Sequence, residues 1–310
     1  MRLVTLGDAA LRLTPPANKR LETAETLEVG VTGPECTAAV AAERLGADAA
    51  WLSRVPETAL GRRLVRELRG HGVDVVAEYA DGRQAVSFFE RGTTPRTDAR
   101  VNVLEGTPLG GLTMDELPTD HAEAADAVYV TAATPTVSAG VAGATAKFLQ
   151  TAADAGATTA VGVFETGGRV DPENARETVE ELFPAVDIFL GGAAAVETLF
   201  GRSGAAGPVM HALASAHGFE TVALGREQTV AAWRDSTVHE FARPDVDAVD
   251  ATGAVDAFAG AFLAGLADGD VSGALRTATA ADALTRTMPG CLPVFSPAEL
   301  RGVAAGLERP

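Results

Sequence analysis

The sequence predicts an α/β fold with a mainly parallel central sheet, helices on both of its faces and a small β-sheet lid. Short apolar runs alternate along the chain with longer helical stretches, a pattern typical of buried parallel strands joined by helices. Two segments, 9–31 and 76–103, break this pattern because they alternate apolar and polar residues and contain turn formers such as Pro15-Pro16 and Asp81-Gly82. Such alternation favours antiparallel strands of a separate sheet.

The individual elements follow from the same patterns. The apolar runs predicted to form the central sheet are Leu3–Leu6, Ala50–Val55, Ala127–Val130, Thr158–Val163, Asp187–Leu190 and Thr221–Leu224. The helices predicted between and after them are Thr37–Leu45, Leu60–His71, Ser138–Ala155, Pro208–His217, Gly253–Leu266, Val271–Arg286 and Pro297–Leu307. We therefore expect a core formed by residues 1–8, 32–75 and 104–310, into which the two lid segments are inserted.

The chain is strongly acidic, which narrows the range of its partners. Its formal charge is −17, from 42 acidic and 25 basic residues. An acidic excess dispersed along the chain is typical of a protein that works in concentrated salt, where charge repulsion is screened. It argues against nucleic acid as a partner, because no basic patch is visible. No apolar run reaches the ~20 residues of a membrane helix and no signal peptide is visible, so we expect a cytoplasmic protein that does not contact membranes.

The segment VDATGAVDAFAGAF combines a glycine with the start of an apolar helix. The backbone amides of Gly253, Ala254 and Val255 would then lie at a helix N-terminus, where amides without intrahelical partners bind anions. Asp256 would lie in the same first turn, where a carboxylate can accept the proton of an attacking hydroxyl while the amides hold a transferring phosphoryl group. A simpler interpretation is that Asp250 or Asp256 only caps the helix.

Together, these motifs resemble those of the ribokinase-like (PfkB) carbohydrate kinases. VDATGAVDAF is similar to the family's D-T-x-G-A-G-D signature, and Gly33–Ala47 resembles its G-G-x-x-x-N helix followed by A-R-L-G-A. The Gly72-Val73-Asp74 turn and the order of the motifs extend the resemblance over essentially the whole chain. The phrases LRLTPP, RLGADAAWLSRVP and RTMPG are most similar to the branch that phosphorylates 2-keto-3-deoxygluconate, in a version of haloarchaeal type.

The resemblance implies a three-layer fold and ATP-dependent transfer of the γ-phosphoryl group to a hydroxyl of a sugar or sugar acid. Asp256 is then the catalytic base, and the amides of Gly253, Ala254 and Val255 form the anion hole. The residues implied for substrate binding are Asp8, Gly33, Thr37, Arg96 and Asp250, and those implied for nucleotide binding are Gly225 and Thr252. ATP and Mg²⁺ are the implied cofactors, and a homodimer through the lids is the implied assembly.

Several positions depart from the family's pattern. In the first signature Thr32 replaces the leading glycine and Thr37 replaces the sugar-binding asparagine, and in the second Val255 replaces a glycine. In the family's N-x-x-E motif, which organises Mg²⁺ through water, Gly192 and Ala195 replace the asparagine and the glutamate. Neither side chain can hold a hydrated cation, so the Mg²⁺ motif is predicted to be lost and no residue is assigned to a metal.

Further departures concern the substrate. The lid tyrosine and arginine of the 2-keto-3-deoxygluconate branch correspond to Asn102 and Leu104, and its D-x-N-x-R stretch corresponds to a sequence ending in Glu165-Thr166. The acidic residue after the late Pro-Gly pair is replaced by Cys291. Arg96 remains in the lid. Its side chain is expected either to be solvated or to face an anionic group of the substrate. Because a carboxylate needs cationic or bidentate partners, we predict weak phosphorylation of 2-keto-3-deoxygluconate.

Three functions are consistent with these observations. The first is an active ATP-dependent sugar kinase of altered specificity, which the retained Asp256 favours. The second is a pseudokinase that binds sugar or nucleotide without efficient turnover, which the lost Mg²⁺ and substrate positions favour. The third is a kinase for a nucleoside or a vitamin-like alcohol, because one fold hosts many substrates.

Overall fold

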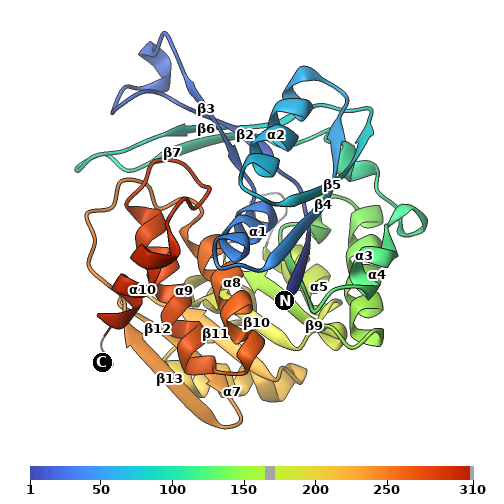
Figure 1. Ribbon diagram of the computed structural model, residues 1–310, viewed down its shortest axis with the longest axis vertical. Coiled ribbons are helices and arrows are strands. Elements are labelled where there is room, and N and C mark those ends of the chain that lie inside the picture. Colours follow the sequence, from blue (N-terminus) through green and yellow to red (C-terminus); the bar gives the residue numbers. More distant parts are fainter. Residues whose placement is uncertain (165–171, 308–310) are drawn as a thin grey trace.

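The computed structural model describes residues 1–164 and 172–307. Over these residues, a central sheet of nine strands has the order β13-β12-β11-β10-β9-β8-β1-β4-β5 (Figure 1). Neighbouring strands from β11 to β5 are parallel, and β12 and β13 continue one edge as antiparallel strands. The strands are β1 Arg2–Leu6, β4 Asp48–Pro56, β5 Asp74–Ala80, β8 Ala127–Thr131, β9 Thr158–Val163, β10 Ile188–Gly192, β11 Thr221–Gly225, β12 Thr229–Arg234 and β13 Thr237–Ala242. The predicted mainly parallel sheet is confirmed.

Helices cover both faces of the sheet (Figure 1), because successive strand residues point to opposite faces. On one face Leu3 and Trp51 pack with α1, α2, α8 and α9, and on the other Val4 and Leu52 pack with α3 to α7. The helices are α1 Pro34–Arg44, α2 Ala59–Gly70, α3 Thr119–Glu123, α4 Ala139–Asp154, α5 Pro172–Glu180, α6 Ala193–Phe200, α7 Ala206–His217, α8 Ala254–Gly265, α9 Val271–Arg286 and α10 Pro297–Ala305. Short 3-10 helices lie at Leu21–Thr23, Pro108–Gly111, Met114–Glu116, Pro135–Val137, Phe183–Ala185 and Leu266–Asp268.

Helices α1 and α8 approach each other closely. A Cβ atom at Gly260 of α8 would collide with the backbone carbonyl oxygen of Ala38 in α1. The contact therefore requires a glycine, which alone lets the two backbones come so near. Since the helices are held together here, their N-termini, at Gly33 and Gly253, reach the same end of the sheet.

A second sheet forms the lid above the carboxyl ends of the central strands (Figure 1). Its order is β3-β2-β6-β7. In the strand register Ser87 lies between Arg12 and Asn102, so these polar side chains share one face of the lid. Phe88 and Val101, each one position along, share the other face. The strands are β2 Ala10–Thr14, β3 Glu28–Thr32, β6 Ala85–Glu90 and β7 Ala99–Val103.

The lid range predicted for residues 76–103 needs correction at its start. Residues Asp74–Ala80 form β5, which pairs in parallel with β4 at the edge of the central sheet. Most side chains of β5 are exposed or half-buried. The reason is that β5 is an edge strand, with a neighbouring strand on one side and solvent on the other. Its sequence therefore alternates like that of a lid strand, and the lid sheet begins in this segment only at Ala85.

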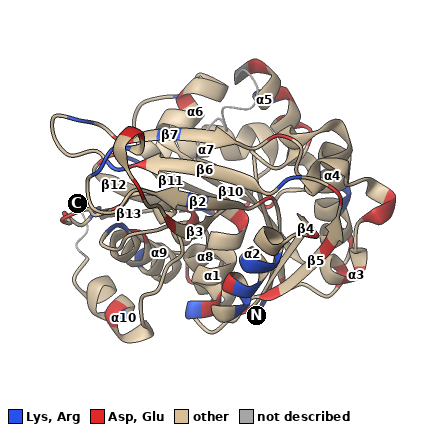
Figure 2. Cartoon of the chain, turned by 90° about the horizontal axis from the view of Figure 1, so that it is seen from above, with Lys and Arg blue, Asp and Glu red and all other residues tan. Residues whose placement is uncertain are grey.

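Charges are distributed unevenly over the surface. Acidic side chains lie on many elements around the molecule, whereas arginines gather on and around α2 (Figure 2). This helix carries Arg62, Arg63, Arg66 and Arg69, of which Arg63 lies 3.6 Å from Glu67 on the same helix. The overall acidic composition concealed this local cluster. Among the helices that the structure describes, none is both long and apolar enough to cross a membrane.

Candidate functional site

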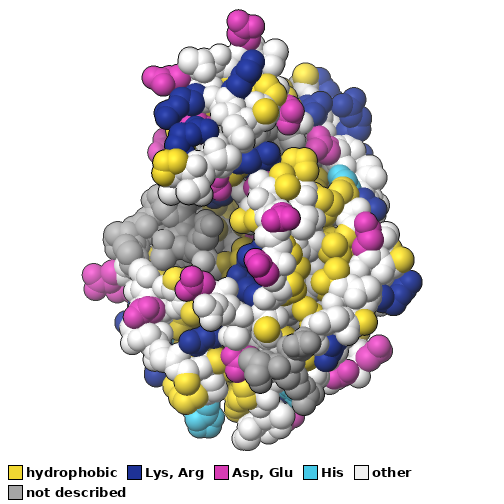
Figure 3. Space-filling view, turned by 90° about the vertical axis from the view of Figure 1, so that its left-hand side faces the viewer, with side chains coloured by type: hydrophobic (Ala, Val, Ile, Leu, Met, Phe, Trp, Pro, Cys, Tyr) yellow, Lys and Arg dark blue, Asp and Glu magenta, His cyan; other side chains and the backbone are white. Residues whose placement is uncertain are grey.

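A cavity of about 550 Å³ lies between the lid and the carboxyl ends of the parallel strands, where open α/β sheets bind ligands. Residues at the ends of β1, β8 and β9 line its floor, the N-termini of α1 and α8 line its walls, and β2, β6 and β7 form its roof. Figure 3 shows the molecule hollowed beneath the lid, whose surface carries several Lys and Arg side chains.

The N-terminus of α8 faces this cavity. Gly253 is the N-cap, with a left-handed backbone conformation (φ 81°), and a Cβ atom there would collide with the carbonyl oxygen of Cys291. Both observations require glycine. The amide of Ala254 donates to the carbonyl of Ala251 at 3.3 Å, and Ala254 itself is buried. Gly253 and Val255 line the cavity and therefore carry the amides best placed for an anion.

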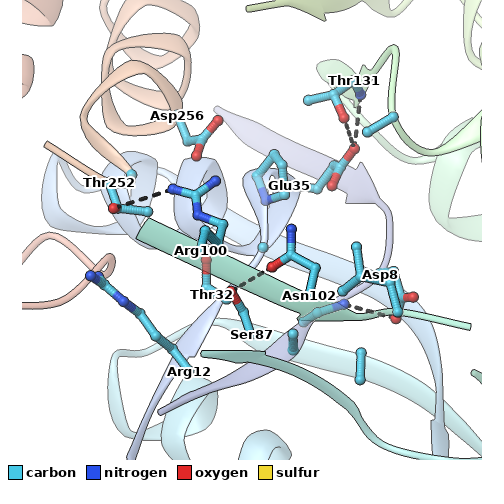
Figure 4. Close-up of a pocket in the computed structure, with 18 of the residues that line it drawn as sticks. Asp8, Arg12, Thr32, Glu35, Ser87, Arg100, Asn102, Thr131, Thr252 and Asp256 are labelled. Carbon is cyan, nitrogen blue, oxygen red and sulfur yellow. Dashed lines mark hydrogen bonds between the residues drawn. The ribbon is translucent and has the colours of Figure 1, made fainter. Parts of the chain in front are cut away.

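Asp256 lies in the first turn of α8 and lines the same wall. Its carboxylate points into the cavity, near the loop that carries Thr252 (Figure 4). Val255 belongs to the helical turn, so its β-branched side chain is compatible with the backbone and only narrows the cavity. The structure thus brings a carboxylate and a helix N-terminus together, as general-base chemistry at a phosphoryl group requires.

On the floor, the buried carboxylate of Glu35 joins α1 to the loop after β8. Its Oε1 accepts hydrogen bonds from the Thr131 amide at 2.9 Å, the Thr131 hydroxyl at 2.6 Å and the Thr134 hydroxyl at 2.6 Å. Burial raises the pKa of Glu35 above its usual value, and these hydrogen bonds oppose the shift. Because Oε1 already accepts three hydrogen bonds from the protein, we assign Glu35 a structural role in the floor of the cavity.

A buried ion pair joins the lid to the loop before α8. Arg12 Nη2 lies 2.7 Å from Asp250 Oδ2, and the side chains are 3% and 0% exposed. The carboxylate of Asp250 also accepts the amides of Thr252 at 3.0 Å and Gly290 at 3.2 Å. Arg12 Nη1 lies 3.0 Å from Cys291 Sγ, and burial raises the pKa of this thiol, which favours its neutral form. Asp250 is therefore an anchor of the loop.

Asp8 joins the point where the chain first enters the lid, before β2, to the point where it last leaves it, after β7. Its Oδ1 accepts the amide of Ala9 at 2.9 Å, and its Oδ2 accepts the hydroxyl of Thr107 at 2.9 Å. In the roof, Ser87 Oγ donates to Asn102 Oδ1 at 2.7 Å (Figure 4). The cavity therefore presents polar groups from both the floor and the roof.

Most of the residues predicted from the sequence meet at this cavity. Those that line it are Asp8, Gly33, Thr252, Gly253, Val255 and Asp256. The predicted substrate residue Asp250 instead lies behind the wall, where Arg12 occupies its carboxylate.

Three predicted residues lie away from the cavity lining. Thr37 is fully buried within α1. Arg96 stays on the lid, with Nη1 3.2 Å from Glu90 Oε1. Gly225 ends β11 beside Gly192 of β10. For Thr37 the reason is geometric: it lies in the second turn of α1, on the side that packs into the core.

Gly192 and Ala195, which correspond to the family's Mg²⁺ motif, carry no side-chain group that could hold a metal. Gly192 has no side chain, and Ala195 presents only a buried methyl group. Within residues 1–164 and 172–307, no group of three or more His, Cys, Asp and Glu side chains is arranged to hold a metal ion. Glu165-Thr166, the predicted remnant of the substrate stretch, lies outside the described residues. A hydrated Mg²⁺ needs oxygen ligands, and the side chains at these two positions supply none.

Two arginines that line the cavity were missed by the sequence analysis. They are Arg12 of β2 and Arg100 of β7. Strand alternation carries the signal that could have identified them, because side chains two positions apart share a face. Arg100 is two positions before Asn102, which had been placed in the lid beside the substrate, and Arg12 is two positions after the cavity-lining Ala10.

A covered parallel sheet with a helix N-terminus and a carboxylate facing a lidded cavity is the architecture of a small-molecule kinase. The chain belongs to the pfkB family of carbohydrate kinases, which matches residues 1–298.

Named relatives agree with this assignment to the sugar kinases. The chain is 40% identical to a 2-dehydro-3-deoxygalactonokinase of Haloferax volcanii, over 99% of each chain. It shares its fold with the crystal structure of a 2-dehydro-3-deoxygluconokinase from Thermotoga maritima, with a TM-score of 0.95 and 24% identity over 99% of this chain and 98% of that one. A ribokinase II candidate from E. coli, solved with ATP and Mg²⁺, gives a TM-score of 0.86 and 18% identity over 98% of this chain and 99% of that one.

Arg12→Met should destabilise the protein, because the carboxylate of Asp250 would lose its closest cation while remaining buried. Removing one partner of a buried ion pair costs about 3–5 kcal/mol, and we expect a loss of this size in the free energy of unfolding measured with denaturant. The control is Arg96→Met, which breaks a more exposed pair and should cost about 1 kcal/mol or less. Equal losses in both variants would contradict an anchoring role for Arg12.

Proposed function

We propose that this chain is an ATP-dependent kinase that transfers the γ-phosphoryl group to a hydroxyl of a 2-keto-3-deoxy sugar acid. The observation that carries the proposal is the shared wall of Asp256 and the α8 N-terminus. A carboxylate there can remove the proton of the attacking hydroxyl. The adjacent amides of Gly253 and Val255 can hold the oxygens of the transferring group, helped by the helix dipole.

The acceptor would lie between floor and roof. Asp8, Ser87 and Asn102 present oxygen and nitrogen atoms to the cavity from both sides, as a polyhydroxylated molecule requires. The cavity volume of about 550 Å³ lies within the usual range for small-molecule sites. The substrate class is supported by the 40% identity to a 2-dehydro-3-deoxygalactonokinase over the full chain.

Asp256→Asn tests the proposed base. An amide cannot accept the hydroxyl proton, so we expect kcat to fall about 10²–10⁴-fold while ATP affinity changes little. The measurement is coupled-enzyme turnover in concentrated KCl, which the acidic surface predicts the protein needs. Asp268→Asn, on the exposed 3-10 helix after α8, is the control and should retain activity. A wild-type protein that binds ATP and sugar acid but transfers no phosphate would instead support the pseudokinase alternative.

The two C4 epimers of the proposed substrate test specificity. We expect 2-dehydro-3-deoxygalactonate to be the better substrate and 2-keto-3-deoxygluconate to remain below about 10⁴ M⁻¹s⁻¹ in kcat/KM, under the ordinary range of evolved enzymes. The reason is that Asn102 and Leu104 replace the lid residues of the gluconate branch. Steady-state kinetics with each epimer measure the ratio. Efficient turnover of the gluconate epimer would show that these positions do not decide specificity.

We also propose that two copies associate through the outer face of the lid. This face is apolar, and Val29, Val101 and Val103 on it are 39%, 57% and 45% exposed. Covering an apolar sheet face of this kind with a second copy removes its side chains from water and lowers the free energy.

Val101→Glu should convert such a dimer into a monomer, because it would bury a charge in the interface. Light scattering coupled to size-exclusion chromatography reports the mass. The control, Val238→Glu, places the same charge on β13, where Val238 is 42% exposed and far from the lid, and should leave the mass unchanged. A wild-type protein that remains monomeric at high concentration would overturn this proposal.

A further inference from the structure

Arg100 extends from the lid toward the proposed point of phosphoryl transfer. It lies on β7 opposite Phe89 of β6, on the face of the lid that lines the cavity. Its Nη2 lies 3.5 Å from the hydroxyl oxygen of Thr252, the residue directly before the N-cap Gly253. Figure 4 shows the guanidinium between Thr252 and the side of the cavity where Asp256 lies. A cation from the lid thus faces the anion-binding end of α8.

The charges around the cavity make this cation important. Among the described lining residues, the carboxylates are Asp8, Glu35, Asp98 and Asp256, and the cations are Arg12 and Arg100. Arg12 is already paired with the fully buried Asp250. A triphosphate would therefore enter a site in which acidic groups outnumber basic ones. Arg100 is the second lining cation, and its side chain is exposed to solvent.

We propose that Arg100 is a catalytic residue that contacts the transferring γ-phosphoryl group from the lid. The proposal rests on the function proposed above and adds a residue to that site. A guanidinium presents several N–H donors in one plane and keeps its charge, which suits the oxygens of a phosphoryl group. With the α8 amides on one side and Arg100 on the other, charge that develops during transfer would be held from both the core and the lid.

The competing role for Arg100 is to hold the carboxylate of the sugar acid. The two roles differ in what they predict for binding. Contact with the γ-phosphoryl group stabilises ATP relative to ADP, because ADP lacks that group. Contact with the carboxylate leaves both nucleotides unchanged and affects only the affinity for the sugar acid.

The first measurement is binding of ADP and of a non-hydrolysable ATP analogue, by titration calorimetry, to the wild type and to Arg100→Gln. We expect the variant to bind the ATP analogue about tenfold or more weakly, the usual scale for one lost charge-assisted contact, and ADP within about twofold of the wild type. Arg100→Lys should recover part of the loss because it keeps the charge. Arg96→Gln, in the same lid but paired with Glu90, should match the wild type with both nucleotides.

The second measurement is turnover of the sugar acid. Arg100→Gln should lower kcat about 10²–10³-fold, as does removal of one donor to a developing charge elsewhere, with a smaller change in KM. Equal effects on the ATP analogue and ADP, or no effect on either, would overturn the proposal. So would a higher KM for the sugar acid with unchanged kcat, which would assign Arg100 to the carboxylate. A wild type without turnover would defeat the proposed function alone, since the nucleotide comparison needs no catalysis.

Discussion

The Arg12–Asp250 ion pair joins two parts of the chain that are far apart in sequence, strand β2 of the lid and the loop between β13 and α8 in the core. Both groups are removed from water, at a cost that an ion pair offsets only when its remaining hydrogen-bonding groups are satisfied. The carboxylate meets this condition, because Asp250 receives two backbone amides. The guanidinium of Arg12 lies over the ring of Phe89 at 3.9 Å, while its buried Nε has no hydrogen-bond partner among the described residues. The position of Gly253, and with it the N-terminus of α8, therefore depends on the lid as well as on the core.

Around this constraint, the cavity has kept its architecture while individual functional positions have changed. Gly253 is required because its left-handed backbone and its contact with Cys291 leave no room for a side chain. Asp256 lies in the first turn of α8, so the helix fixes its position beside Gly253. Cys291, which the motif resemblance matches with an acidic residue of the family, has a pKa raised by burial and accepts a contact from Arg12. Since Arg12 already has Asp250 as its counter-ion, a second acid beside it is not needed for charge balance.

The sequence predicted the six central strands from β1 to β11 that are continuous apolar runs, and the longer helices, because such patterns report burial directly. It did not predict the antiparallel edge strands β12 and β13 or the short helices α3, α5 and α6. It placed β5 in the lid because an edge strand and a lid strand are both covered on one side. Within the site, motif positions such as Gly253 and Asp256 came from local spacing. The ion pair of Arg12 with Asp250 could not be predicted in this way, since the two residues meet only through the packing of the lid on the core, and spacing along the chain carries no record of that contact. Strand alternation places Arg100 on the cavity face, but the residue lies outside every family motif.

The division of charges between the core and the lid has a consequence for the fate of ATP in the absence of an acceptor. Asp256 belongs to the core, whereas Arg100 belongs to the lid, and Asp8 joins the first and the last of the segments that connect the lid to the core. Under the role proposed for Arg100, the transferring phosphoryl group is fully stabilised only while the lid covers the cavity. A bound sugar then occupies the position from which water would attack. An open molecule would hold nucleotide without the cation that speeds its cleavage. The same geometry that positions the sugar would thus protect the cell's ATP from wasteful hydrolysis.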